Sequence, residues 1–470
     1  MDKLKAISTG TVNAILKKIY KILVKIFPFL PKQIDVHFRE LLKGSTVTLI
    51  IRLLGMVVTY FFTFLVTRNY GAVAMGIFSL SQTVLLIASI VAKLGLDSSS
   101  LRFVAEYSSQ GKWGNVKEVY IKSLKLIIPT SIFVTCLFFF CAPVLSQYVF
   151  KKPYLSSYFK IMALSLLPFS ILFLHSESLR GLKKIVEYAI FRNMSIPFAA
   201  SLVMCIALFF PKDMSVPVIA HVIGTGVLCA ISLIVWFRHA KILEYKAEKS
   251  LRYKNILDVS LPLMLSSSML LIMHWTDTIM LGIFRSETDV GIYNVAIKIA
   301  NFTAIPLFAI NGISAPKFAE FYGKGDMRGL KKVVMQSTKL IFWSSFPILL
   351  VFLFFPSFSL GLFGKEFKTG FYALEFLTIG QFVNAISGSV GIILQMTGKQ
   401  KAFQNIMLFA TVLNITLNVV LIPRYGINGA AFASMIAMAF WNLSSVIYVK
   451  SYLKIVTLYI PFLTRKRIKK

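Results

Sequence analysis

The chain has 470 residues, of which 57% are hydrophobic and only 15% charged, and 51 lysines and arginines against 19 carboxylates give a net charge of +32. Soluble proteins carry about 25% charged residues, so this composition excludes an ordinary soluble domain and predicts a membrane protein. The basic residues lie between long apolar runs and not on a polar domain, which favours attraction to anionic lipid and argues against nucleic-acid binding.

The first segment, residues 1–44, mixes lysines with apolar residues at helical spacing, as in LKKIYKILVKIF at 16–27. This pattern predicts a basic amphipathic helix lying on the inner leaflet of the membrane, and a disordered basic tail is the alternative. We do not interpret the segment as a signal peptide, because no uninterrupted apolar core follows its lysines.

Apolar runs long enough to cross a bilayer fill most of the remaining chain. A spanning helix needs about 20 mostly apolar residues. The sequence therefore predicts an all-α membrane protein with about 12 transmembrane helices, at 45–67, 73–95, 124–149, 156–178, 189–210, 216–237, 256–283, 290–315, 334–363, 370–396, 404–422 and 428–449. We interpret the prolines within these runs as kinks, because neighbouring helices in a bundle satisfy the freed carbonyls.

The distribution of lysine and arginine predicts the orientation. Most basic residues outside the spans fall in the two termini and in every second loop. The positive-inside rule then places both termini in the cytoplasm, and we expect a multi-pass protein of the cytoplasmic membrane. On this reading residues 240–255 form a cytoplasmic linker and residues 451–470 a basic cytoplasmic tail.

The chain also contains an internal repeat. MGIFSLSQ from Met75 corresponds to VGIYNVAI from Val290, which sets Gly76 opposite Gly291 at an offset of 215 residues. After a one-residue slip, KLII at 125–128 corresponds to KLIF at 339–342. The repeat predicts two six-helix lobes, 45–239 and 256–450. Because a six-helix unit begins and ends on the same side, a pseudo-twofold axis along the membrane normal relates the two lobes.

The segments DTIMLG (277–282) and VGIYNVAIK (290–298), together with GLDSSSLRFVAEY (95–107), resemble the polysaccharide transporter family. This family contains the O-antigen and related lipid-linked oligosaccharide flippases, and it belongs to the superfamily of multidrug and toxin exporters and lipid II flippases. The resemblance covers roughly residues 40–450. It implies alternating access between two lobes and export of a polyprenyl-diphosphate-linked glycan across the cytoplasmic membrane.

Basic residues near the inner ends of the spans are candidate ligands of the diphosphate. A charge inside the bilayer is costly and needs a partner or water, and guanidinium groups suit phosphates because they offer paired planar donors. We expect the diphosphate and its sugars to contact Arg52, Lys93, Arg102, Arg180 and Lys298. The alternative is that basic side chains near the inner surface simply extend to lipid headgroups.

The segment LIMHWTDTIMLG (271–282) sets His274 and Asp277 one helical turn apart inside an apolar run. We expect these two residues to bind the coupling ion, either H⁺ or Na⁺, since histidine titrates in the physiological range. Lys298 on the next span lies at a similar depth, and we predict that it pairs with Asp277. A purely structural ion pair is the alternative.

The sequence shows no nucleophile motif, nucleotide-binding loop or metal-spaced cluster, so we expect neither an enzyme nor a cofactor. Amides within the spans, Asn414 and Asn418 among them, are suited to sugar hydroxyls or to bonds between helices. The rival function is an ion-coupled multidrug and toxin exporter, although its cationic drugs favour acidic cavities. We expect a monomer whose partners are the glycan lipid and membrane lipid, with glycan polymerase or ligase machinery as a further candidate.

Overall fold

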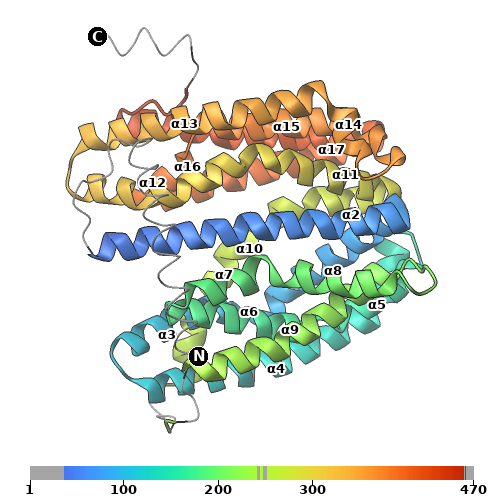
Figure 1. The fold of residues 1–470 in the computed structure, drawn as a ribbon, viewed down its shortest axis with the longest axis horizontal. Helices are drawn as coiled ribbons and strands as arrows, with labels where there is room; N and C mark the ends of the chain where they lie inside the picture. The colour runs from blue at the N-terminus through green and yellow to red at the C-terminus, as the bar shows by residue number, and fades with distance from the viewer. Residues whose placement is uncertain (1–35, 241–243, 247–250, 460, 462–470) are drawn as a thin grey trace, which may run out of the picture.

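The structure is a computed structural model that describes residues 36–240, 244–246, 251–459 and 461. The side chains of residues 36–47 and 265–274 lie outside the described part. Figure 1 shows two groups of helices, α3–α9 on one side and α11–α17 on the other, with α2 running between them. The predicted amphipathic segment 1–44 and the end of the basic tail fall almost wholly outside the described residues.

The first half of the chain is a series of helices joined by short connections. Its elements are α2 (Val36–Lys93), α3 (Leu96–Ser109), α4 (Trp113–Val144), the π-helical turn η1 (Leu145–Val149), α5 (Leu155–Ala163), α6 (Leu166–Gly181), α7 (Ile185–Asn193), α8 (Ser195–Ala207) and α9 (Val216–Ala240).

The second half repeats this pattern. Its elements are α10 (Tyr253–Phe284), α11 (Glu287–Asn301), η2 (Phe302–Ala304), α12 (Ile305–Gly323), α13 (Met327–Phe354), α14 (Pro356–Gly361), η3 (Lys365–Gly370), α15 (Phe371–Ser387), α16 (Val390–Met396) and α17 (Gln400–Leu453). Every predicted span falls on one or two of these helices, so the all-α prediction is confirmed.

The two longest helices each contain two predicted spans. Gly71 breaks α2 with a φ of 77°, and Gly426 breaks α17 with a φ of 58°. Both values lie in the left-handed region that glycine adopts without a steric penalty. Within the described residues, six helices are long and apolar enough to cross a membrane, or nine if each bent pair is one span. The exact number of crossings therefore stays a prediction.

The prolines divide into two groups. Pro129, Pro262 and Pro347 lie inside helices that continue past them, so these prolines do not end the helices. Pro197 instead stands in the first turn of α8, beyond a bend of 51° between α7 and α8. The first turn tolerates proline because its N–H groups have no partner within the helix.

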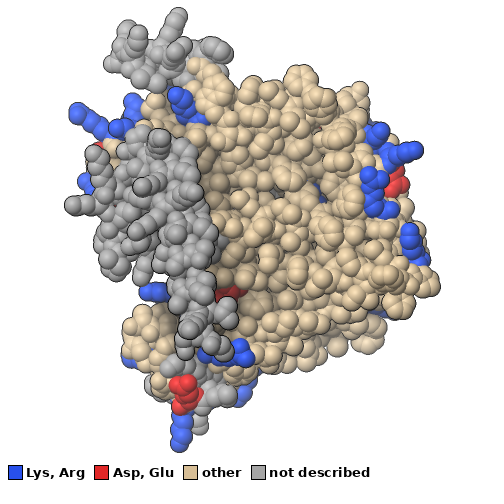
Figure 2. All heavy atoms as spheres, in the orientation of Figure 1, with Lys and Arg blue, Asp and Glu red and all other residues tan. Residues whose placement is uncertain are grey.

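The molecule has two charged ends separated by an apolar belt. Figure 2 shows lysines and arginines gathered at both ends of the long axis, with a surface between them that is largely free of charge. We call the end where α2 begins and α17 finishes the terminal end, and the end that carries the break at Gly71, η1 and the α10–α11 turn the distal end (Figure 1). A bilayer requires an apolar surface of this kind between polar ends. With six helices long and apolar enough to cross a membrane among the described residues, the chain is a multi-pass membrane protein.

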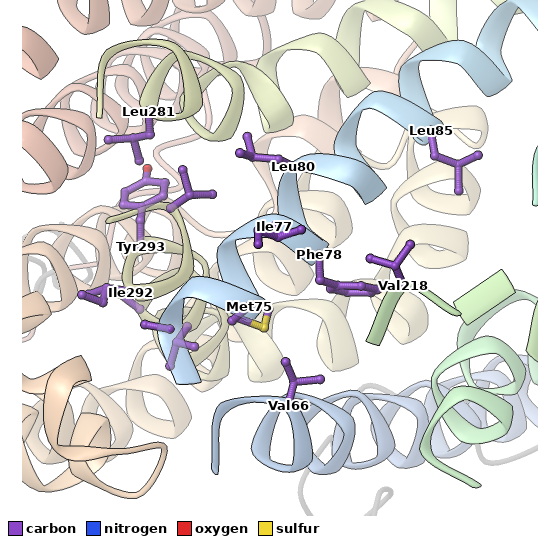
Figure 3. Close-up of a cluster of buried hydrophobic side chains, with 14 of the residues drawn as sticks. Val66, Met75, Ile77, Phe78, Leu80, Leu85, Val218, Leu281, Ile292 and Tyr293 are labelled. Atoms are coloured by element: carbon purple, nitrogen blue, oxygen red, sulfur yellow. The ribbon is translucent and has the colours of Figure 1, made fainter. Parts of the chain in front are cut away.

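The two lobes share one hydrophobic core at the distal end. Leu281 and Tyr293 of the second lobe pack in the same buried cluster as Ile77 and Leu80 of the first (Figure 3). Toward the terminal end each lobe has a cluster of its own, around Leu96, Val119 and Trp236 in the first lobe and around Phe318, Val334 and Leu453 in the second. The lobes are therefore joined distally and have separate cores at the terminal end.

Helix α10 connects the two lobes along its length. Near the terminal end, Ile256 belongs to the first lobe's cluster, and a Cβ added to Gly95 would lie 2.2 Å from the carbonyl oxygen of Ser260. At its distal end α10 contributes Leu281 to the shared core. Although the predicted second lobe starts at residue 256, the first turns of this helix pack on the first lobe.

Candidate functional site

Arg52 lies on the face of α2 that meets the second lobe. Its guanidinium carbon is 4.4 Å from the centre of the Phe308 ring on α12, and the side chain is exposed. Gly55, one turn further, allows α2 to approach the α7–α8 junction, because a Cβ there would lie 2.4 Å from the carbonyl oxygen of Asn193. This close approach brings Arg52 next to the charged end of α7.

A carboxylate and two more arginines lie beside that junction. Arg180 on α6 and Arg192 on α7 both reach Glu177, with N–O distances of 3.4 and 4.0 Å. The hydroxyl of Tyr188 is within electrostatic range of Glu177 and of the guanidinium groups of Arg52, Arg180 and Arg192. The fold thus collects three arginines from three helices around one tyrosine.

Lys93 extends this group from the end of α2. Its Nζ is 3.2 Å from Asp97 and 4.6 Å from the centre of the Phe173 ring, which Arg192 approaches at 4.3 Å. Phe173 therefore contacts a cation from each of two helices, an arrangement that gains cation–π attraction. We call Arg52, Lys93, Arg180 and Arg192 the cationic cluster. Its four cations outnumber the two carboxylates, Asp97 and Glu177, that face them.

Lys298 stands apart from the cationic cluster, at the contact between α11 and α2. Its Nζ donates a hydrogen bond of 2.9 Å to Thr63 Oγ1, and the Tyr60 hydroxyl donates to the Lys298 carbonyl. The rings of Tyr60 and Phe302 stack at 4.2 Å. Thr63 follows Arg52 by eleven residues, which is about 16 Å and three turns along one helix face. Lys298 and Arg52 thus lie along the same interface between the lobes.

Arg102 is a further predicted site residue, and it lies on α3, which packs against α6 at Gly181. It is exposed on α3, and none of the described contacts joins it to the cationic cluster.

Asp277 is buried, with 4% of its surface exposed, and it binds neutral partners. It accepts hydrogen bonds from the Tyr293 hydroxyl at 2.6 Å, from Asn418 Nδ2 at 2.6 Å and from the Ser434 hydroxyl. Among the described residues it forms no ion pair with Lys298, so the predicted pairing is wrong. Lys298 instead turns to the first lobe, and hydroxyl and amide dipoles stabilise the carboxylate. The side chain of His274 lies outside the described residues.

The surroundings of Asp277 include an unused acceptor. Asn418 Nδ2 also donates to Asn414 Oδ1 at 3.1 Å, while Asn418 Oδ1 is buried without a hydrogen-bond partner in the described structure. One carboxylate, two amide oxygens and a hydroxyl are the oxygen ligands that hard cations prefer. No group of three or more histidine, cysteine or carboxylate side chains suited to a metal occurs among the described residues. The donor set fits an alkali cation or a proton better than a transition metal.

Sequence reasoning missed part of both sites. It did not include Arg192 among the candidate ligands of the diphosphate, and it did not single out Tyr188 or Phe173. It named Asn414 and Asn418 as amides within spans, but it did not connect them with Asp277. The available signal was three polar residues, Asp277, Asn414 and Asn418, all placed deep in apolar runs.

The family model for polysaccharide biosynthesis proteins matches residues 41–321. A second model, MatE, matches residues 262–420. A probable low-salt glycan biosynthesis flippase, Agl15 of Haloferax volcanii, is 24% identical over 182 residues. That match covers 38% of this chain and 39% of the relative, so it spans about two fifths of each protein.

Solved transporter structures share the fold. A multidrug resistance MATE family transporter of the MOP superfamily, in an inward-facing conformation, superposes with a TM-score of 0.71 at 14% identity, covering 86% of this chain and 98% of that one. The lipid II flippase MurJ in an inward closed conformation gives 0.67 at 14% identity, covering 87% of each chain. A MOP superfamily transporter from Pyrococcus furiosus gives 0.60 at 16% identity, covering 88% and 96%. These likenesses confirm the predicted two-lobe fold.

Proposed function

The chain belongs to the polysaccharide biosynthesis protein family, and from that premise we propose that it is a flippase for a lipid-linked oligosaccharide. The cargo is a glycan carried on an isoprenoid diphosphate, which moves from the inner to the outer leaflet of the cytoplasmic membrane. The two lobes rock against each other, so that the head group enters at the terminal end and leaves at the distal end when the contacts between the lobes there open.

The cationic cluster is the observation that carries this proposal. Four cations and two carboxylates leave a net charge of +2 beside an apolar belt. A diphosphate compensates such a charge, and guanidinium groups bind phosphate oxygens in pairs. A cationic drug would be repelled at the same place, which favours the glycan lipid over the multidrug exporter on this fold.

The contact between α2 and the α11–α12 segment extends the path of the head group. Beyond Arg52, the same face of α2 carries Tyr60 and Thr63, and Lys298 is the next cation along it. Aromatic rings provide flat apolar faces for sugars, and Phe302 and Phe308 line this interface. We propose that the diphosphate first binds the cationic cluster and then passes to Lys298 as the lobes move.

We assign ion coupling to Asp277 and its neighbours. The carboxylate, the free Asn418 Oδ1, Asn414 and Ser434 supply oxygens at one place in the second lobe. Bound Na⁺ would compensate the charge of the buried carboxylate, and protonation of the carboxylate would remove it. These side chains come from α10 and from both halves of α17. Binding of either ion therefore changes how tightly those helices pack against each other.

Reconstitution tests the function directly. Purified protein in liposomes is given a polyprenyl-diphosphate oligosaccharide, and the fraction of glycan cut by an impermeant glycosidase outside the vesicles is followed with time. We expect complete cleavage with the wild type and about half with protein-free vesicles. A cleaved fraction that stays at the protein-free level, while a cationic dye is pumped, would reject the glycan lipid in favour of the drug exporter.

A further inference from the structure

Lys152 reaches from the first lobe into the distal turn of the second. It lies between η1 and α5, and its Nζ is 3.2 Å from Glu287 at the start of α11. The same Nζ donates to the carbonyl oxygen of Gly282 at 3.1 Å and to that of Arg285. Those carbonyls end α10, and a cation is stabilised at the C-terminus of a helix.

Glu366 makes the corresponding contact in the opposite direction. It lies in η3 of the second lobe, and its Oε1 accepts a hydrogen bond of 2.6 Å from the backbone N–H of Ala72 in the first lobe. Ala72 follows the break at Gly71, so its N–H begins the second half of α2. An anion is stabilised at the N-terminus of a helix. Each lobe thus holds the distal turn of the other through a charge suited to a helix end.

The internal repeat makes these two contacts equivalent. The offset of 214 residues that relates Lys125 to Lys339 also relates Lys152 to Glu366. The offset of 215 that relates Gly76 to Gly291 relates Ala72 to Glu287. Lys152 and Glu366 thus occupy equivalent positions in the two repeats but have opposite charges. Each contacts the other lobe at the equivalent turn, which lies across the pseudo-twofold axis.

Two glycines at equivalent positions bring the turns close together. A Cβ added to Gly76 would lie 1.8 Å from the Glu287 carbonyl oxygen, and one added to Gly291 would lie 2.1 Å from the Ala72 carbonyl oxygen. This reciprocal approach places α2 and α11 in backbone contact. It lies beside the shared distal core, whereas the terminal end has separate cores.

We propose that Lys152 and Glu366 form a reciprocal latch that holds the distal end closed, and that the latch opens when the cargo leaves. The inference rests on the rocking of the lobes in the proposed function, but it concerns residues distant from the cationic cluster and from Asp277. A few charge-assisted bonds to helix ends break together when the lobes separate. The latch thus stabilises the closed distal end, and it no longer opposes the motion of the lobes once these bonds are broken.

The test measures access to the lobe interface without any cargo. Thr63 is fully buried and contacts Lys298 across the interface, so Thr63→Cys, in a chain whose four native cysteines are replaced by serine, reports separation of the lobes. An impermeant thiol reagent is applied to intact cells and to inverted vesicles. The latch variants Lys152→Met and Glu366→Gln are compared singly and together. Lys151→Met removes the exposed neighbouring lysine and serves as the matched control.

We expect each single variant to raise the labelling rate from the distal side by about tenfold, which is the effect of losing one charge-assisted hydrogen bond from a two-state equilibrium, and the double variant to raise it further. Labelling from the terminal side should fall or stay the same, and the Lys151→Met rate should match the parent. Unchanged distal labelling in the double variant would overturn the latch. So would an equal rise from both sides, since that reports general loosening. Glycan flipping plays no part in the readout, so a failed flipping assay leaves this result interpretable.

Discussion

At the scale of single residues, a charged side chain in apolar surroundings needs hydrogen-bond partners to stabilise it. Asp277 has three hydrogen-bond donors and the Lys298 ammonium has Thr63, although the two charges do not meet. A carboxylate in low dielectric is stabilised by oriented dipoles as well as by a cation. The spacing along the chain placed both residues at similar depth, but the direction of each side chain depends on which helix packs beside it.

Arg52 is the residue on which capture of the diphosphate depends most. Arg52→Ala should lower the initial flipping rate in liposomes by about 10- to 100-fold, because one paired charge-assisted contact to phosphate is lost. Arg52→Lys should retain part of the rate, since it keeps the charge without the planar donors. Lys125→Ala, which removes an exposed cation on α4, is the control and should behave as the wild type. Equal rates for Arg52→Ala and Lys125→Ala would remove Arg52 from the binding path.

Asp277 should carry the response to the coupling ion. If Na⁺ binds there, NaCl should raise the melting temperature of the detergent-solubilised protein above its value in KCl, by about 1 °C per kcal/mol of binding energy. Asp277→Asn should abolish that difference, and Asp289→Asn, at the start of α11, should preserve it. No difference between the two salts, combined with flipping driven by a pH gradient, would identify the proton instead. A sodium response that survives in Asp277→Asn would place the ion elsewhere.

At the scale of helices, glycines decide where elements bend and where they touch. Gly71 and Gly426 break long helices, and Gly76 and Gly291 allow two helices from different lobes to meet. Apolar helices gain little from the hydrophobic effect inside a bilayer, so close packing of small residues contributes more to their association. Pro129, Pro262 and Pro347 lie inside helices that continue past them, whereas Pro197 follows a bend of 51° between α7 and α8.

The crossing of α2 and α11 predicts a measurable cost. Gly76→Ala places a methyl group within 1.8 Å of a carbonyl oxygen and should destabilise the protein by about 1–3 kcal/mol. Gly226→Ala is the matched control, because nothing lies within 4 Å of a Cβ at that helical position. This control should be neutral or more stable by up to about 1 kcal/mol, since alanine favours helices. Thermal unfolding in micelles compares the two, and equal melting temperatures would contradict the backbone contact.

At the scale of the whole molecule, two lobes are joined by a shared distal core and by α10. The linker is also held by the first lobe, since Lys117 donates to the Tyr245 carbonyl at 2.8 Å and Trp113 stacks on the Tyr245 ring. Helices inserted separately can still associate within a bilayer. The covalent connection is therefore less important for assembly than the packed interface.

A divided chain tests this view. Fragments 1–246 and 247–470, produced together in one cell, should copurify through a tag on either fragment, because the shared core and the start of α10 provide the interface. The same fragments bearing Gly76→Leu, which blocks the contact between α2 and α11, should copurify less. Failure of the unmodified fragments to copurify would show that the linker itself is required.

The sequence by itself determined the membrane class, the helical content and the duplication. These depend on the apolar composition, on the length of the apolar runs and on the repeat of sequence, because the bilayer requires apolar residues along the whole length of every span. The repeat also set Gly76 opposite Gly291, and the two helices meet there. Only the tertiary structure decided which charges meet, because a side chain's partner depends on helix rotation and tilt. It turned Lys298 toward Thr63, gave Asp277 neutral donors and gathered Arg192 with Arg52, through contacts between residues far apart in the chain.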